Sequence, residues 1–112
     1  MKLQKSKFML AQTPNPPYYA VIFSSLRADD DPAYHETALR MVELAREQPG
    51  FLGMESARNE VGITVSYWES EEAIRRWKQQ TDHVEAQQSG RKNWYSAYSV
   101  RVCRVERAYE FG

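Results

Sequence analysis

His83 is one of only two histidines in the chain, and it is the side chain best suited to moving a proton. An unperturbed imidazole titrates near neutral pH, so His83 could act as a general base or as a hydrogen-bond donor. The alternative is a solvent-facing residue near a helix end, paired with Asp82 or Glu85. His35 falls in the first turn of a predicted helix, where a surface position is expected.

Other common catalytic groups are poorly represented. The two histidines are far apart and no Cys, His and Asp residues have ligand spacing, so we predict no metal site. The single Cys103 has no evident base partner, and its neighbours Val102 and Val105 indicate ordinary packing. The sequence has no glycine-rich phosphate loop and no G-x-S-x-G motif, which argues against nucleotide binding and serine hydrolysis.

Aromatic side chains gather around the second predicted helix: Tyr67, Trp68, Trp77, Trp94, Tyr95 and Tyr98. Trp77 lies nine residues after Trp68, on the helix face that also carries Ala73 and Ile74. Such a group can line a pocket for an apolar ligand, but aromatic residues in strands are more often part of the core or an interface. For Trp77, core packing is the first alternative to a role in chemistry.

Hydrophobic periodicity and turn residues predict the elements that position these side chains. Asp31-Pro32 and Ser70 are suited to begin helices, while Gln48-Pro49-Gly50 and Ser89-Gly90 are suited to end them. Residues 81–83 could bend or break the second helix, and residues 91–95 are predicted to form a short helical turn. The predicted strands are residues 18–26, 51–58, 63–68 and 96–109.

This β-α-β-β-α-β order predicts an α+β, ferredoxin-like domain: a four-stranded antiparallel sheet with both helices on one face. The other face would carry apolar residues from several strands without cover, which is not expected of a soluble monomer. We therefore expect a homodimer formed through this face. Val100, Val102 and Val105 of the last strand are expected to reach across to the partner.

Length and charge limit the remaining possibilities. A chain of 112 residues forms one domain, here residues 18–112, preceded by a proline-rich tail of residues 1–17 that lies across a neighbouring subunit or is disordered. Equal numbers of basic and acidic residues, 15 each, argue against nucleic acid or a membrane as partner. The absence of a membrane-length apolar run and the lone cysteine favour a cytoplasmic protein.

Three stretches carry a family resemblance: QPGFLGMESAR (residues 48–58), ITVSYWESEEAIRRW (63–77) and VRVCRVERAY (100–109). They resemble the antibiotic-biosynthesis-monooxygenase-like domains of the dimeric α/β-barrel superfamily. That family has a PGF turn before the hairpin and a W-x-S-x-E-A junction before a helix that contains a later tryptophan. The resemblance covers residues 18–109 and implies the same fold and dimerisation.

The family includes cofactor-free quinone-forming monooxygenases, haem-degrading enzymes and members without a known reaction. In the haem-degrading relatives, a histidine follows the helix tryptophan by ten residues and the first strand holds an asparagine. Here the corresponding position is Gln87, and residues 18–26 contain no asparagine. His83 follows Trp77 by six residues, about 600° around a helix, and points elsewhere. Haem degradation is therefore disfavoured.

The quinone-forming relatives need an apolar pocket, a group that favours the substrate anion, and exclusion of water. The residues that the resemblance makes candidates are His83 and Trp77 for catalysis, and, for substrate binding, Tyr67, Arg91, Ser24, Ser66 and Trp94. The alternatives are ordinary strand serines and a solvated helix end at Arg91. The first hypothesis is a cofactor-independent monooxygenase of small aromatic or polyketide-like compounds. The alternative is a non-catalytic protein that binds a small apolar or aromatic molecule in the same pocket.

Overall fold

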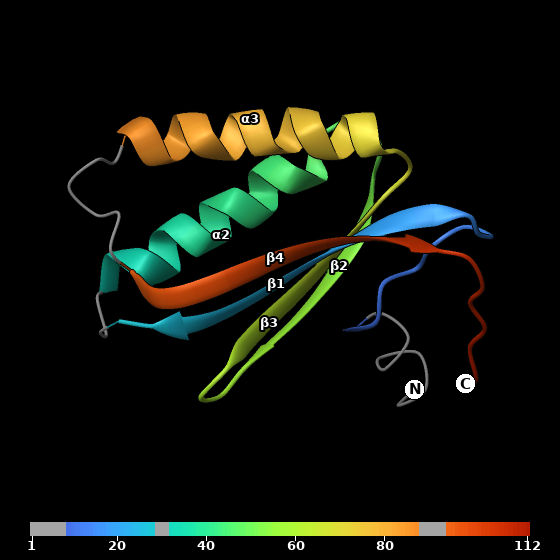
Figure 1. Ribbon diagram of the computed structural model, residues 1–112, viewed down its shortest axis with the longest axis horizontal. Helices are drawn as coiled ribbons and strands as arrows, with labels where there is room; N and C mark the ends of the chain where they lie inside the picture. Colours follow the sequence, from blue (N-terminus) through green and yellow to red (C-terminus); the bar gives the residue numbers. More distant parts are fainter. Residues whose placement is uncertain (1–8, 29–31, 88–93) are drawn as a thin grey trace.

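The computed structural model describes residues 9–28, 32–87 and 94–112 and contains a four-stranded sheet and two long helices (Figure 1). The elements follow one another in the predicted order: β1 (Tyr18–Arg27), α2 (Pro32–Arg46), β2 (Phe51–Arg58), β3 (Gly62–Trp68), α3 (Glu71–Gln87) and β4 (Tyr95–Val105). The ferredoxin-like fold is therefore confirmed. Among the described residues, no helix is both long and apolar enough to cross a membrane.

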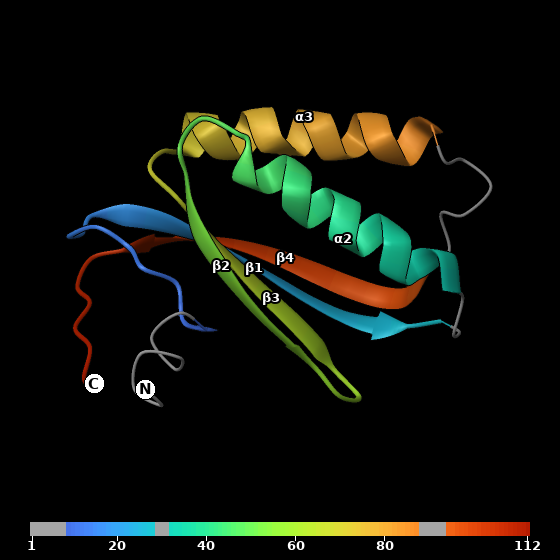
Figure 2. The same cartoon turned by 180° about the vertical axis from the view of Figure 1, so that it is seen from behind.

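The sheet is antiparallel throughout, with the strand order β2-β3-β1-β4. β1 is central, as its apolar sequence predicts, because a strand covered on both faces carries few polar side chains. Both helices lie on the same side of the sheet in the two views, and the described segments before β1 and after β4 lie on the other side (Figures 1 and 2).

The register decides which side chains lie under the helices. Tyr19 pairs with Trp68 and Ser25 pairs with Gly62, and alternation along each strand then assigns every other residue. The helix-facing side carries Tyr19, Val21, Phe23, Ser25, Thr64, Ser66, Trp68, Met54, Arg58, Tyr98, Val100 and Val102. The open side carries Tyr18, Ala20, Ile22, Ser24, Leu26, Ile63, Val65, Tyr67, Glu55, Ser99, Arg101 and Cys103.

Helix α3 begins at the predicted cap. The Ser70 hydroxyl accepts a hydrogen bond from the Ala73 amide at 3.1 Å, and Glu71 and Glu72 occupy the first turn. Carboxylates are favourable there because the helix dipole is positive at that end. The bend predicted at residues 81–83 is wrong: α3 continues to Gln87, and Lys78 bridges to Asp82 at 3.2 Å one turn later.

Gly50, in the turn between α2 and β2, packs against the start of α3. Its φ of +87° is a left-handed conformation, and a Cβ placed there would lie 2.7 Å from the Ala73 Cβ. Its carbonyl accepts a hydrogen bond from the Glu69 amide at 2.8 Å. The turn before β2 and the junction before α3 are thereby held together, so the predicted PGF turn has a structural purpose.

The predicted tail comprised residues 1–17, of which the structure describes residues 9–17. Residues 9–17 lie against the open side of their own sheet, where the Ala11 amide donates to the Glu55 carboxylate at 2.9 Å. The Thr13 hydroxyl donates to the Tyr18 hydroxyl at 3.0 Å. Tyr18 and Ala20 are consequently buried within a single chain. Part of the surface expected to be bare is covered by this segment.

Strand β4 starts earlier and ends earlier than predicted. Tyr95 belongs to the strand and not to a helical turn, and residues 91–93, including Arg91, lie outside the described residues. Val100 and Val102 lie on the helix-facing side of this edge strand, about half exposed, whereas Val105 pairs with Tyr18 on the open side. The three valines thus do not form one surface, because Val105 differs from the others by an odd number of residues.

Candidate functional site

The tryptophan end of the helix-facing side lies where β3 passes into α3. Trp68 is fully buried, and its ring stacks on Trp77 of α3 with a centroid distance of 6.0 Å. Phe51 packs edge-on against Trp68 at 5.3 Å. The Trp68 indole N–H donates to the Ser66 hydroxyl at 2.8 Å. Two candidates, Trp77 and Ser66, are therefore brought together around Trp68, which fills the space between sheet and helix.

The tyrosine end lies beneath the start of α2, where β1 ends and β4 begins (Figure 1). Tyr34 of α2 makes edge contacts with Trp94 and Tyr95, each at 5.8 Å between centroids. Phe23 contacts Tyr95 at 5.3 Å and stacks on Tyr98 at 5.4 Å. The Trp94 carbonyl accepts a hydrogen bond from the Ala28 amide at 2.8 Å, which holds the start of β4 beside the end of β1. These five rings form a continuous aromatic wall.

Two guanidinium groups lie at the tyrosine end. Arg27 sits 3.8 Å above the centroid of the Tyr34 ring, a cation–π geometry. Arg58 comes from the opposite edge of the sheet and donates a hydrogen bond to the buried Ser25 hydroxyl. The backbone beneath the Arg58 guanidinium is Gly62, and a Cβ at that position would collide with it. The glycine therefore makes room for the cation.

The hydroxyl of Tyr95 remains protonated at neutral pH. Burial is the main cause of its raised pKa, and the hydrogen bond that it donates to the Tyr34 hydroxyl at 3.4 Å adds to the shift, while Arg58 and Arg27 oppose it. A neutral phenol of this kind is a hydrogen-bond donor and not a base. The tyrosine end thus combines aromatic surface, hydroxyl donors and positive charge.

Tyr67 lies on the other side of the sheet from Ser66, because neighbouring strand residues alternate. Its hydroxyl donates to the Glu55 carboxylate at 2.7 Å, and its ring contacts Tyr18 edge-on at 5.9 Å. Burial, followed by the hydrogen bond with Glu55, raises the pKa of Tyr67 to about 12. The Glu55 carboxylate also holds Ala11, so Tyr67 belongs to the contact between the sheet and residues 9–17.

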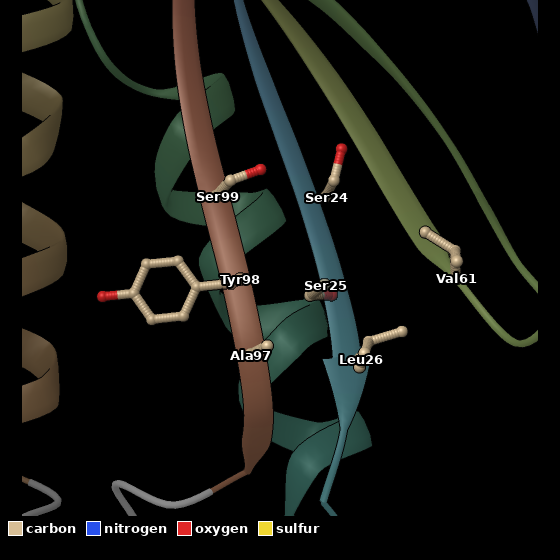
Figure 3. Close-up of a pocket in the computed structure, with 7 residues that line it drawn as sticks. All are labelled: Ser24, Ser25, Leu26, Val61, Ala97, Tyr98 and Ser99. Atoms are coloured by element: carbon tan, nitrogen blue, oxygen red, sulfur yellow. The ribbon is translucent and has the colours of Figure 1, made fainter.

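Ser24 lines a shallow hollow of about 260 Å³ on the open side. Figure 3 shows Ser24 and Ser99 extending from neighbouring strands, with Leu26 and Val61 nearby. Leu26 and Val61 are 43% and 48% exposed, so this hollow is the apolar part of the open side that residues 9–17 leave uncovered. Its lining also includes Ser25 and Tyr98 of the tyrosine end, so the hollow lies at the edge that the two sides of the sheet share.

The predicted site residues therefore separate into groups. Trp77 and Ser66 lie at the tryptophan end, Trp94 lies at the tyrosine end, and Tyr67 and Ser24 lie on the open side. His83 is exposed on α3, six residues beyond Trp77. Arg91 lies outside the described residues. Among the residues that the structure describes, no three His, Cys, Asp or Glu side chains gather in a way that could hold a metal.

Sequence reasoning missed Tyr34, Arg27, Arg58 and Ser25 as members of one cluster. They come from the first helix and two non-adjacent strands, and only the sheet order brings them together. The sequence offered one indication of this cluster. Arg58 and Gly62 flank the predicted hairpin turn, and pairing of the two strands places the arginine opposite the glycine.

Comparison with known proteins agrees with this architecture. Residues 17–89 match the family model described as antibiotic biosynthesis monooxygenase. A protein of Bacillus subtilis strain 168, named uncharacterized protein YqjZ, is 56% identical over 100 residues, which cover 88% of each chain.

Solved structures with a similar fold include SnoaB from Streptomyces nogalater, described as a cofactor-independent oxygenase, with a TM-score of 0.67 and 13% identity over 83% of this chain and 97% of that one. PA3566 from Pseudomonas aeruginosa has a TM-score of 0.60 and 18% identity over 86% and 99% of the two chains. At these identities the likeness concerns the fold. The family model spans well over half of the chain and the Bacillus relative shares more than half of the aligned residues, so the chain belongs to the antibiotic biosynthesis monooxygenase family.

Proposed function

We propose that the protein is a cofactor-independent monooxygenase that oxidises small aromatic compounds between its sheet and its helices. Membership of the family supports this, as does the fold shared with SnoaB, which is described as a cofactor-independent oxygenase. The single observation that carries the proposal is the aromatic lining of the helix-facing side, with Trp68 and Trp77 at one end and Tyr34 and Tyr95 at the other.

The proposed reaction converts a phenolic C–H position into a carbonyl. The substrate loses two hydrogen atoms, one atom of O₂ enters the quinone product, and the other leaves as water. The electron-rich substrate anion supplies the electrons that reduce oxygen, so the protein has to bind the ring, favour its ionised form and keep water away. Trp77 is proposed as a wall against which the substrate ring packs. His83 is kept as the proposed base, although it is exposed on the unbroken helix α3 and lies about 600° around that helix from Trp77; the base role therefore requires a substrate that reaches the solvent-facing side of α3.

Oxygen uptake with dithranol, a dihydroxyanthrone, tests the reaction directly, because the product quinone absorbs visible light. Trp77→Ala is expected to lower kcat/KM at least about tenfold, since a wall that orients the ring is lost. His83→Gln tests the base and is expected to lower kcat without a matching change in KM. Trp77→Phe is the matched control, because it keeps an aromatic surface. Catalytic rates no higher than the buffer background with the unaltered protein would refute the proposal.

One observation favours the alternative function, a ligand-binding protein without turnover. Trp68 and Trp77 are stacked on each other and Trp68 has no exposed surface, so the tryptophan end is filled. Under this alternative, dithranol or its quinone would be retained through dialysis while no oxygen is consumed. Measuring retention and oxygen uptake on the same sample separates the two functions.

We further propose that the protein acts as a homodimer through the open side. Leu26, Val61 and Ile63 on that side are 43%, 48% and 44% exposed, and residues 9–17 do not cover them. Ile63→Asp is expected to shift the sedimentation coefficient from dimer to monomer, because a carboxylate cannot be buried there without a partner. Leu39→Asp, at a position on α2 that is 66% exposed, is the control. A stable monomer of the unaltered protein would refute this arrangement.

A further inference from the structure

The tyrosine end contains hydrogen-bond donors that have no strong acceptor among the described residues. The Trp94 indole N–H is buried and has no hydrogen-bond partner among the described residues. A buried donor left without a partner costs about 1–3 kcal/mol, so such a group calls for an acceptor that the chain does not provide. Beside it, the Tyr34 and Tyr95 hydroxyls form a long contact of 3.4 Å that leaves room for a stronger acceptor.

Arg58 supplies positive charge at the same place. Arg58 donates to Ser25, which lies opposite Tyr98 on β4, and the Tyr98 ring contacts the Tyr95 ring at 6.1 Å between centroids. In the described part of the chain the Arg58 guanidinium donates to the Ser25 hydroxyl and forms no ion pair with a carboxylate. Ser25 is 2% exposed, so its hydroxyl holds one edge of the guanidinium in a buried position. The remaining N–H donors of Arg58 are then available to a ligand. Gly62 provides the space in which the group lies.

The aromatic wall around these donors defines the shape of what could bind. Phe23, Tyr95 and Tyr98 present ring surfaces at mutual centroid distances of 5.3, 5.4 and 6.1 Å. Tyr98 is 65% exposed, so this wall is reachable from solvent at the uncovered edge of the sheet. A flat ring resting on the wall would carry its polar substituent toward Arg58 and Trp94.

We propose that the tyrosine end binds the anionic oxygen of an aromatic ligand, a ring-borne carboxylate or phenolate, with Arg58 supplying the charge and the Trp94 N–H a hydrogen bond. This inference rests on the proposed function in that the helix-facing side would hold the substrate of the oxidation, here at the tyrosine end. It adds the residues that would hold the anion, Arg58 and Trp94, and it predicts that a neutral aromatic ring alone is bound weakly.

Naphthoate and naphthamide test the charge, because the two probes have the same shape and differ in one negative charge. Isothermal titration is expected to show naphthoate binding at least about tenfold more tightly than naphthamide. Arg58→Gln should weaken naphthoate at least about tenfold, as expected for loss of a hydrogen bond between charged groups, and leave naphthamide within about twofold. Gly62→Ala, which keeps the charge but displaces the guanidinium, should weaken naphthoate in the same direction.

Arg104→Gln is the matched control, since Arg104 is an exposed arginine of β4 that pairs with Glu106 at 3.1 Å. Trp94→Phe, which removes the N–H and keeps a ring, should weaken naphthoate more than naphthamide. If Arg58→Gln does not fold, Arg58→Met, which also removes the charge and keeps a long side chain, takes its place. The inference is overturned by equal binding of the two probes, by no saturable naphthoate binding, or by equal effects of Arg58→Gln and Arg104→Gln.

This test is independent of turnover. A preference for naphthoate that depends on Arg58, in a protein that consumes no oxygen with dithranol, would uphold the anion site and refute the monooxygenase. Oxygen uptake by a protein that binds both probes equally would do the reverse.

Discussion

Replacing Ser66 by alanine removes one oxygen atom from the tryptophan end and should destabilise the protein by about 2 kcal/mol. The Ser66 hydroxyl accepts the hydrogen bond of the Trp68 indole at 2.8 Å, and Trp68 has no exposed surface, so water cannot replace it. A buried donor left unpaired costs about 1–3 kcal/mol. For a domain whose total stability is about 5–15 kcal/mol, that is a large fraction.

Urea unfolding followed by tryptophan fluorescence measures this effect. With a slope of about 2 kcal/mol per molar urea, the midpoint of Ser66→Ala should fall by about 1 M without a change in slope. Protein concentration has to be held constant, because a dimer unfolds at a concentration-dependent midpoint. Ser56→Ala, an exposed serine on the same side of the sheet, is the control and should stay within about 0.5 kcal/mol.

A double-mutant cycle with Trp68→Phe tests the cause of the effect. Phenylalanine has no N–H, so adding Ser66→Ala to Trp68→Phe should cost at least about 1 kcal/mol less than Ser66→Ala alone. The reasoning is refuted if Ser66→Ala is as mild as Ser56→Ala, or if the two substitutions are additive.

Further predictions concern the open side and the turn at Gly50. Because burial and Glu55 raise the pKa of Tyr67 to about 12 from about 10 in the unfolded chain, the stabilisation from its protonated form is complete below pH 10 and is lost as the pH rises toward 12. Tyr67→Phe should therefore lose less stability over that alkaline range in pH-dependent urea unfolding, and an unchanged slope would contradict the assignment. Gly50→Ala should cost about 2–4 kcal/mol in the same assay, because left-handed strain adds to a contact of 2.7 Å with Ala73, whereas Gly112→Ala, with nothing nearby, should be neutral. A neutral Gly50→Ala would show that the turn adapts.

Local patterns were sufficient for the helices and strands. Pro32, Ser70 and Gly50 mark boundaries through capping and backbone conformation, which depend on a few neighbouring residues. The bend predicted at residues 81–83 was wrong. The weak preference of these residues against a helix interior did not interrupt α3, and Asp82 forms an ion pair with Lys78 one turn earlier in the same helix.

The candidate site was only partly accessible to such reasoning. Trp77 and Ser66 lie near one another because the β3–α3 junction is local in sequence. Tyr67 was grouped with them although alternation places it across the sheet from Ser66, beside Glu55. The alternation of side chains along a strand could have placed Ser66 and Tyr67 on opposite faces of the sheet. Which face the helices cover, however, is decided only by the tertiary structure.

The amino-acid sequence alone determined the order of strands and helices, their approximate limits and the family, since each depends on periodicity or on short motifs. Only the tertiary structure decided that Arg58, Ser25, Tyr34 and Tyr95 meet, and that residues 9–17 cover Tyr18. These contacts join residues far apart along the chain. They arise from the strand order β2-β3-β1-β4 and from packing between layers, which local sequence patterns do not encode.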